Sequence, residues 1–246
     1  MDERSMSMTP AEMPMTATTE ESTKGRVPTD DPRALQILTT EHWSLLSARA
    51  LVYNESFARA GMFLAFLSTT LFGLGLVATA TGFSDAFLVI AAVILVVDLF
   101  IGLASLGRIG SASQEDMRSL QAMGRLRHAY MEMVPGLEPY FMSAIHDDAA
   151  SVLAVYGPAS PHPISNLLHG LTTMPGMIGM LCSVLIGVLA AVLLLLATHD
   201  PTAAGLVGFA ALLVSFGVIT GVAITRVTRF MSSLTAAFPR SEPNED

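Results

Sequence analysis

Four apolar blocks constrain the fold of this chain more than any other feature of its sequence. Each block is roughly 20 residues long, which is the length that a helix needs to cross a hydrocarbon layer of about 30 Å. The blocks lie at residues 61–83, 86–106, 176–197 and 204–225. Because backbone polar groups in lipid must be satisfied within their own segment, the blocks are predicted to be transmembrane helices.

The connections between the blocks predict how these helices pair. The first two blocks are joined by a turn around Ser84 and Asp85, and the last two by residues 198–203. Such short connections make antiparallel neighbours. We therefore predict an all-α integral membrane fold with two transmembrane helical hairpins, at residues 61–106 and 176–225.

Composition supports the membrane assignment and excludes other classes of protein. Hydrophobic residues make up 52% of the chain and charged residues only 14%, whereas soluble domains carry about 25% charged residues. The net charge of −8 argues against a nucleic-acid partner, so the expected partner is the lipid bilayer. The single cysteine, Cys182, lies inside the third block, which excludes an intrachain disulfide and a cysteine-based zinc site.

The distribution of positive charge predicts the orientation. All 13 Lys and Arg residues lie in residues 1–60, 107–175 or 226–246, and neither short turn contains one. Four crossings place these three regions on one side of the membrane, and the excess of positive charge marks that side as cytoplasmic. Both termini are therefore predicted to be cytoplasmic.

A helical cytoplasmic module is predicted before and between the hairpins. Residues 1–33 have the composition of a disordered tail and contain no signal peptide. A cytoplasmic or interfacial helix is expected over residues 34–60, with Asp31 as its N-cap and Pro32 at its first position. No Pro or Gly occurs between Pro32 and Gly61, so this helix could run on into the first crossing.

The segment 107–175 is predicted to be helical at first and to end in a proline-rich connector. An apolar stripe from Met117 to Val134 predicts a helix that Pro135 and Gly136 terminate. A third helical stretch is expected over about 139–156, and a short interfacial helix over about 164–171. Residues 226–246 are expected to form a cytoplasmic tail.

Asp98 is the one carboxylic acid in the four blocks, which contain no basic residue. It lies eight residues from the cytoplasmic end of its block, about 12 Å deep, where an acid costs on the order of 3 kcal/mol. It should therefore face the bundle, and the seven-residue spacing of Ser84, Ala91, Asp98 and Ser105 supports this orientation. Small and hydroxyl-bearing residues lie at a similar depth on the other helices: Ser68, Thr69, Thr70, Ser183, Ser215 and Thr220.

Two interpretations of this polar layer remain open. Arg108, ten residues away, is about 15 Å from Asp98 along the helix, so we expect an uncompensated Asp98 to be largely protonated. The layer could then be a proton- or cation-handling site in a channel or small transporter. Alternatively, Asp98 forms a hydrogen bond with Ser68, Thr69 or Thr70 that fixes helix packing.

Small residues predict close helix contacts in the second hairpin. Ser183 and Gly187 in the third block, and Gly217 and Gly221 in the fourth, are four residues apart. This spacing allows helices to approach closely. It serves either the fold of one chain or a homo-oligomer.

No catalytic, cofactor-binding or metal-binding residues are predicted. His128 and Glu132 lie one helical turn apart, and His146 is followed by Asp147 and Asp148, yet neither group has the spacing of a known metal motif. The chain also contains no glycine-rich phosphate loop and no nucleophile elbow. We therefore predict that the protein is not an enzyme.

Two stretches carry a resemblance to known sequences. They are EHWSLLSAR at 41–49 with YNESF at 53–57, and RLRHAY at 125–130 with LEPYF at 137–141 and HDD at 146–148. They resemble a group of uncharacterised four-crossing membrane proteins from GC-rich, actinobacterial genomes, over roughly residues 35–230. The resemblance implies a bacterial plasma membrane protein and carries no assigned activity.

Together these features predict a non-enzymatic inner-membrane assembly, scaffold or signalling element. It is expected to form a homo-oligomer, and a cytoplasmic protein partner is possible. The alternative is a small oligomeric channel or transporter with its proton or cation site at Asp98.

Overall fold

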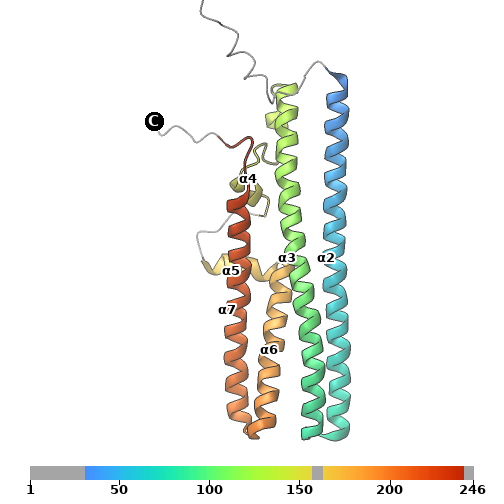
Figure 1. Cartoon of the computed structure of the whole chain (residues 1–246), viewed down its shortest axis with the longest axis vertical. Coiled ribbons are helices and arrows are strands. Elements are labelled where there is room, and N and C mark those ends of the chain that lie inside the picture. Colours follow the sequence, from blue (N-terminus) through green and yellow to red (C-terminus); the bar gives the residue numbers. More distant parts are fainter. Residues whose placement is uncertain (1–30, 157–162, 241–246) are drawn as a thin grey trace, which may run out of the picture.

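The computed structural model describes residues 31–156 and 163–240, and the secondary structure there is entirely helical (Figure 1). The elements are α2 (Pro32–Thr81), α3 (Asp85–Met133), the 3-10 helix η1 (Glu138–Tyr140), α4 (Ala149–Ala154), α5 (Pro163–Thr172), α6 (Met174–Thr198) and α7 (Pro201–Ser233). The predicted tail at residues 1–33 lies almost wholly outside the described residues.

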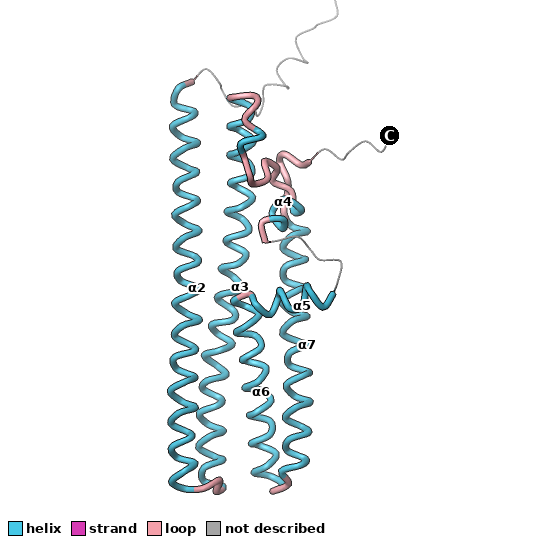
Figure 2. The backbone as a smooth tube through the Cα atoms, turned by 180° about the vertical axis from the view of Figure 1, so that it is seen from behind, coloured by secondary structure: helices cyan, strands magenta, loops and turns pink. Residues whose placement is uncertain are grey.

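Four of these helices, α2, α3, α6 and α7, are long and apolar enough to cross a membrane. They form two antiparallel pairs, α2 with α3 and α6 with α7, and α3 packs against α6 to join the pairs (Figures 1 and 2). The first pair turns at Gly82, whose φ of 65° lies in the region that favours glycine. The two predicted hairpins are therefore both present.

Helices α2 and α3 are much longer than a membrane crossing requires. They contain 50 and 49 residues, or about 75 Å of helix each. The short helix α5 lies crosswise to the long helices and packs against α6, away from α2 (Figure 1). We call residues 32–60 of α2 and 107–133 of α3 the stalk, since they continue each helix beyond its predicted crossing.

One row of buried residues runs along α3 from the membrane part into the stalk. Its members recur every three or four residues: Leu88, Ala91, Leu95, Asp98, Gly102, Ser105, Ile109, Ala112 and Asp116. This is the heptad spacing of helices that pack side by side over a long distance. The seven-residue repeat from Ala91 to Ser105 thus extends into the stalk, whereas Ser84 is exposed and caps the helix.

Residues 139–156 do not form the single helix that their sequence suggests. The chain makes only the three-residue η1 and the six-residue α4, with an irregular segment between them. Tertiary contacts occupy this segment: a Cβ added at Gly124 would lie 2.6 Å from the carbonyl oxygen of His146. Close contact with α3 and with the end of the chain replaces local helix formation here.

Residues 226–240, which were expected to form part of a cytoplasmic tail, are helical as far as Ser233 and then contact α3. Helix α7 runs eight residues beyond the predicted crossing, to Ser233. Gln121 on α3 then donates hydrogen bonds of 3.1 Å to the carbonyl oxygens of Asp147 and Thr235. We call residues 234–240 the C-terminal segment; residues 241–246 lie outside the described part.

Candidate functional site

Asp98 lies in the centre of the predicted membrane core and is fully buried. Its Oδ2 atom is 2.8 Å from the hydroxyl oxygen of Thr70 on α2. The same hydroxyl oxygen is 2.9 Å from the carbonyl oxygen of Leu67. The Oδ1 atom of Asp98 is buried and has no hydrogen-bond partner among the described residues.

The number of protons available at the Thr70 hydroxyl indicates how its contacts with Leu67 and Asp98 are satisfied. A hydroxyl group has one proton, so Thr70 cannot donate to Leu67 and Asp98 together. Both short contacts are satisfied when Asp98 is protonated, donates to Thr70, and leaves the hydroxyl proton for the carbonyl of Leu67. A neutral carboxyl group also avoids placing an unpaired charge in an apolar core.

The surroundings of Asp98 are closed and apolar. One helical turn away, a Cβ added at Gly102 would lie 2.9 Å from both the Cys182 sulfur and the Phe63 ring. The absence of a side chain at Gly102 therefore allows α2, α3 and α6 to meet. Phe63 and Cys182 are themselves fully buried, and neither cavity described below includes Asp98.

The other two hydroxyl residues beside Thr70 do not reach Asp98. Ser68 and Thr69 are exposed on α2. Their hydroxyl groups donate to the carbonyl oxygens of Leu64 and Ala65, within the same helix. Of the three candidates for the packing hydrogen bond, only Thr70 makes it.

The polar residues of the second hairpin form a separate contact. Ser183 is fully buried and donates to the carbonyl oxygen of Gly179. The Ser215 hydroxyl lies 3.5 Å from the Ser183 carbonyl oxygen and 3.0 Å from that of Leu212. Thr220 is half-buried on α7. Ser183 and Ser215 therefore belong to the contact between α6 and α7, and within the described residues no hydrogen bond joins either of them to Asp98.

Close approach of α6 and α7 depends on Gly187 and Gly208. A Cβ added at either glycine would lie 2.8 Å from the other's carbonyl oxygen. Gly217 and Gly221, by contrast, have no atom within 4 Å of an added Cβ, so within one chain they do not serve helix packing. The role of Gly208 was not predicted from the sequence. The signal that could have found it is a stripe of small residues on α7: Ala204, Gly208, Ala211 and Ser215.

A second buried acid, Asp116, lies on the same row of α3 within the stalk. Arg49 on α2 pairs with it at 2.6 Å from Nε to Oδ1 and at 3.2 Å from Nη2 to Oδ2. The Tyr156 hydroxyl donates to Oδ2 at 2.5 Å. Burial first, and then this contact with Asp116, raise the pKa of Tyr156 above its usual range. Tyr156 therefore remains a hydrogen-bond donor.

A third buried acid, Asp147, holds the C-terminal segment. Its carboxylate accepts the backbone N–H groups of Ala237 and Phe238 at 2.8 and 2.7 Å, and Arg125 pairs with it at 2.7 Å. Burial alone would raise the pKa of Asp147, but the N–H of Ala237 and the side chain of Arg125 outweigh burial and hold that pKa below its usual range. The attachment of the C-terminal segment to Asp147 was not predicted, since Ala237 and Phe238 lie 90 and 91 residues from Asp147 in sequence.

Potential metal ligands are not grouped in the described part of the chain. His128 lies 3.7 Å from Glu132 and stacks on Phe238 at 4.0 Å between ring centroids. Among the described residues, no three His, Cys, Asp or Glu side chains are grouped to hold a metal ion.

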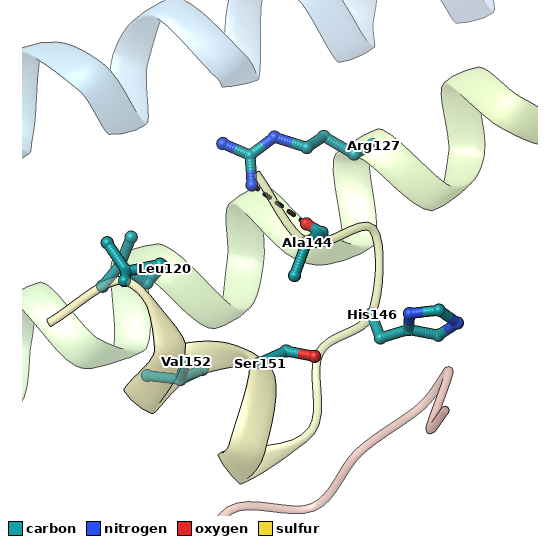
Figure 3. A pocket seen from close by; sticks show the side chains of 7 residues that line it. Leu120, Arg127, Ala144, His146, Ser151 and Val152 are labelled. Carbon is teal, nitrogen blue, oxygen red and sulfur yellow. Dashed lines mark hydrogen bonds between the residues drawn. The ribbon is translucent and has the colours of Figure 1, made fainter. Parts of the chain in front are cut away.

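A small cavity lies beside α3 and α4, between Arg127, His146 and Ser151 (Figure 3). Its volume is about 10 Å³, which is room for roughly one water molecule. Arg127 donates to the carbonyl oxygen of Ala144 at 3.2 Å, and the Ser151 hydroxyl is buried without a partner. A cavity of this size fits a structural role better than substrate binding.

Length and hydropathy of α2, α3, α6 and α7 decide the class of this protein. It is a multi-pass membrane protein. No protein-family model, curated protein or solved structure matches the chain. Its function is therefore proposed from the helices and side chains described above.

Proposed function

We propose that this protein is a non-enzymatic assembly element of a bacterial plasma membrane. In this proposal the four membrane helices act as an anchor, and the stalk binds a helix of a protein partner on the cytoplasmic side. The observation that carries it is an exposed apolar face on the stalk part of α2.

This α2 face consists of five large side chains at helical spacing. They are Leu35, Trp43, Leu46, Tyr53 and Phe57, all exposed. At 100° per residue they fall within an arc of about 80°. Trp43 and Phe57 are 66% and 63% exposed, although both precede the predicted membrane crossing. Contiguous apolar surface outside lipid is typical of protein-binding sites.

The position of the α2 face favours a helix as its partner. α2 packs mainly against α3, through a stripe that includes His42, Arg49 and Ser56, and the α2 face lies beside this stripe. A helix with its own apolar stripe could lie along α2 and cover the face over several turns.

A second copy of the chain is the partner that fits the predicted homo-oligomer. A twofold axis along the membrane normal would place two α2 helices parallel, so that the same residues meet across the axis. Leu46, near the middle of the face, would then lie close to Leu46 of the second copy.

Cysteine cross-linking in native membranes tests this arrangement. Cys182 is fully buried, so an introduced cysteine is the one expected to react. Leu46→Cys should form disulfide-linked dimers, whereas Leu51→Cys, which is exposed on another side of α2, should not. Adding Trp43→Glu to Leu46→Cys should abolish the cross-link because it places a charge within the face.

The alternative outcomes are distinct. A monomeric Leu46→Cys variant, together with a co-purifying protein that Trp43→Glu releases, would replace the second copy by a different partner. If Trp43→Glu changes neither cross-linking nor co-purification, the assembly role is wrong.

A channel or transporter is the second candidate, and the unpartnered Oδ1 of Asp98 favours it. A buried, protonated carboxyl group could release its proton if the helices separate in an oligomer, and the resulting carboxylate could then bind a cation. Liposomes with the purified protein test this with Asp98→Asn, which retains a hydrogen bond to Thr70 but cannot release a proton. Flux in the wild type that Asp98→Asn abolishes would favour transport, and equal absence of flux in both folded proteins would exclude it under the conditions used.

A further inference from the structure

A groove on the surface of α7 combines an apolar end with a cationic end. It has a volume of about 450 Å³ and is lined by Val218, Gly221, Val222, Thr225, Arg226 and Arg229. Gly221 opens its floor, since a Cβ added there would meet no atom within 4 Å. All six residues lie on one helix, with the valines toward the predicted crossing and the arginines toward the stalk end.

The two arginines of the groove differ from the other arginines near the same end of the bundle. Arg59 and Arg108 each pair with Glu55 at 2.9 Å, and Arg108 also pairs with Glu115 at 3.1 Å, so two carboxylates balance these two arginines. Arg118 lies over the Phe230 ring at 5.3 Å. Within the described part of the chain, the guanidinium groups of Arg226 and Arg229 have no hydrogen bond and no ion pair. Helix α7 itself contains no Asp or Glu.

The hydroxyl group of Thr225 does not compete for the arginines. It donates to the carbonyl oxygen of Gly221 at 2.7 Å, within the helix. The cationic end of the groove therefore presents two exposed guanidinium groups, one helical turn apart, without a counter-charge. Guanidinium groups bind phosphate oxygens through paired N–H donors.

The location of the groove favours a lipid as the source of that phosphate. The arginines directly follow the predicted crossing at residues 204–225, so they lie at headgroup level. Val218 and Val222 lie one to two turns deeper, where an acyl chain passes. A free phosphate would use only the cationic end, whereas an anionic phospholipid complements both ends.

We propose that this α7 groove binds an anionic phospholipid of the leaflet next to the stalk, with Arg226 and Arg229 holding its phosphate group and the Val218–Val222 surface holding its acyl chain. This site is independent of the α2 face and adds lipid recognition to the proposed assembly role.

Lipid retention by the full-length protein tests the proposal. The purified protein is exposed to detergent micelles that contain phosphatidylglycerol or phosphatidylcholine, and native mass spectrometry counts the lipids retained. Phosphatidylglycerol should be retained preferentially, and R226Q/R229Q should weaken its apparent affinity by about tenfold or more, since each basic residue contributes to anionic-lipid attraction. The matched control is Arg59→Gln, which removes an arginine already paired with Glu55 and should leave retention unchanged.

A second variant separates the groove from its charge. Gly221→Leu fills the groove and keeps both arginines, so it should also reduce phosphatidylglycerol retention. The proposed lipid site is wrong if both lipids are retained equally, or if Arg59→Gln reduces phosphatidylglycerol retention as much as R226Q/R229Q does. Displacement of phosphatidylglycerol by millimolar inorganic phosphate would assign the site to a free anion. Cross-linking of Val222→Cys between two copies in membranes would assign the groove to a second chain.

Discussion

Arg49 on α2 and Asp116 on α3 form a two-point ion pair across the stalk, and Tyr156 donates a third hydrogen bond to the same carboxylate. The side chains of Arg49 and Asp116 are only 20% and 5% exposed. Tyr156, more than 100 residues from Arg49 in sequence, thus helps to fix how α2 and α3 pack in the stalk.

Removing one partner of this pair should destabilise the stalk. Asp116→Ala leaves the Arg49 guanidinium partly buried without a counter-charge, and we expect a loss of about 2–4 kcal/mol in the free energy of unfolding. Arg33→Ala is the control, since its side chain is 81% exposed and should change stability little. Chemical denaturation in mild detergent measures both, and equal effects of the two variants would contradict a buried role for the pair.

Attachment of the C-terminal segment should depend on pH through Asp147. Its folded-state pKa lies below the ordinary value, so the ionised carboxylate stabilises the attached state above the unfolded pKa of about 3.9. This stabilisation is lost as the pH falls through the lower folded-state pKa. The hydrogen-exchange protection factors of the amides of Ala237 and Phe238, which compare each rate with that of an unfolded chain at the same pH, should therefore fall at strongly acidic pH.

Substitution of the acid provides the control for that pH effect. Asp147→Asn should give fast exchange at neutral pH, because the neutral amide replaces the charge that Arg125 and the two N–H groups recognise. Glu138→Gln, at an exposed position in η1, should exchange like the wild type. Protection factors in Asp147→Asn that match those of the wild type at every pH would exclude Asp147 as the attachment point.

The same substitution should lower the free energy of unfolding at one glycine of the second hairpin and leave it nearly unchanged at another. Gly187→Ile places a side chain where α7 backbone lies within 3 Å, and overpacking of this kind costs about 1–3 kcal/mol or more. Gly217→Ile enters open space and should change the free energy of unfolding by less than about 0.5 kcal/mol. Thermal unfolding in detergent compares them. A destabilised Gly217→Ile would mean that this face is covered, which in turn would indicate an oligomer contact.

Cys182 should report on the three-helix contact at Gly102. Its side chain is fully buried, so a maleimide should label it only when α2, α3 and α6 separate. Gly102→Val, which forces a side chain against Cys182 and Phe63, should speed labelling. Gly107→Val, with no atom near its added Cβ, should leave the rate unchanged. Rapid labelling of the wild type in native membranes would contradict the closed core.

The sequence placed Asp98 on the buried side of its helix because a seven-residue repeat is a local property that the chain displays directly. It could not choose among Ser68, Thr69 and Thr70, since three consecutive residues point in different directions and the rotation of α2 is set by its packing on α3. The pairing of Asp98 with Thr70 follows only from that rotation.

The sequence by itself determined the number of membrane helices, their pairing into hairpins and the buried side of α3 at Ala91, Asp98 and Ser105. These follow from segment length, short connections and periodicity, all of which act over a few residues. Only the tertiary structure decided that Asp116 pairs with Arg49, that Gly187 meets Gly208, and that Asp147 holds the C-terminal segment. Each of these contacts joins parts of the chain far apart in sequence, and its free energy depends on packing that no local pattern encodes.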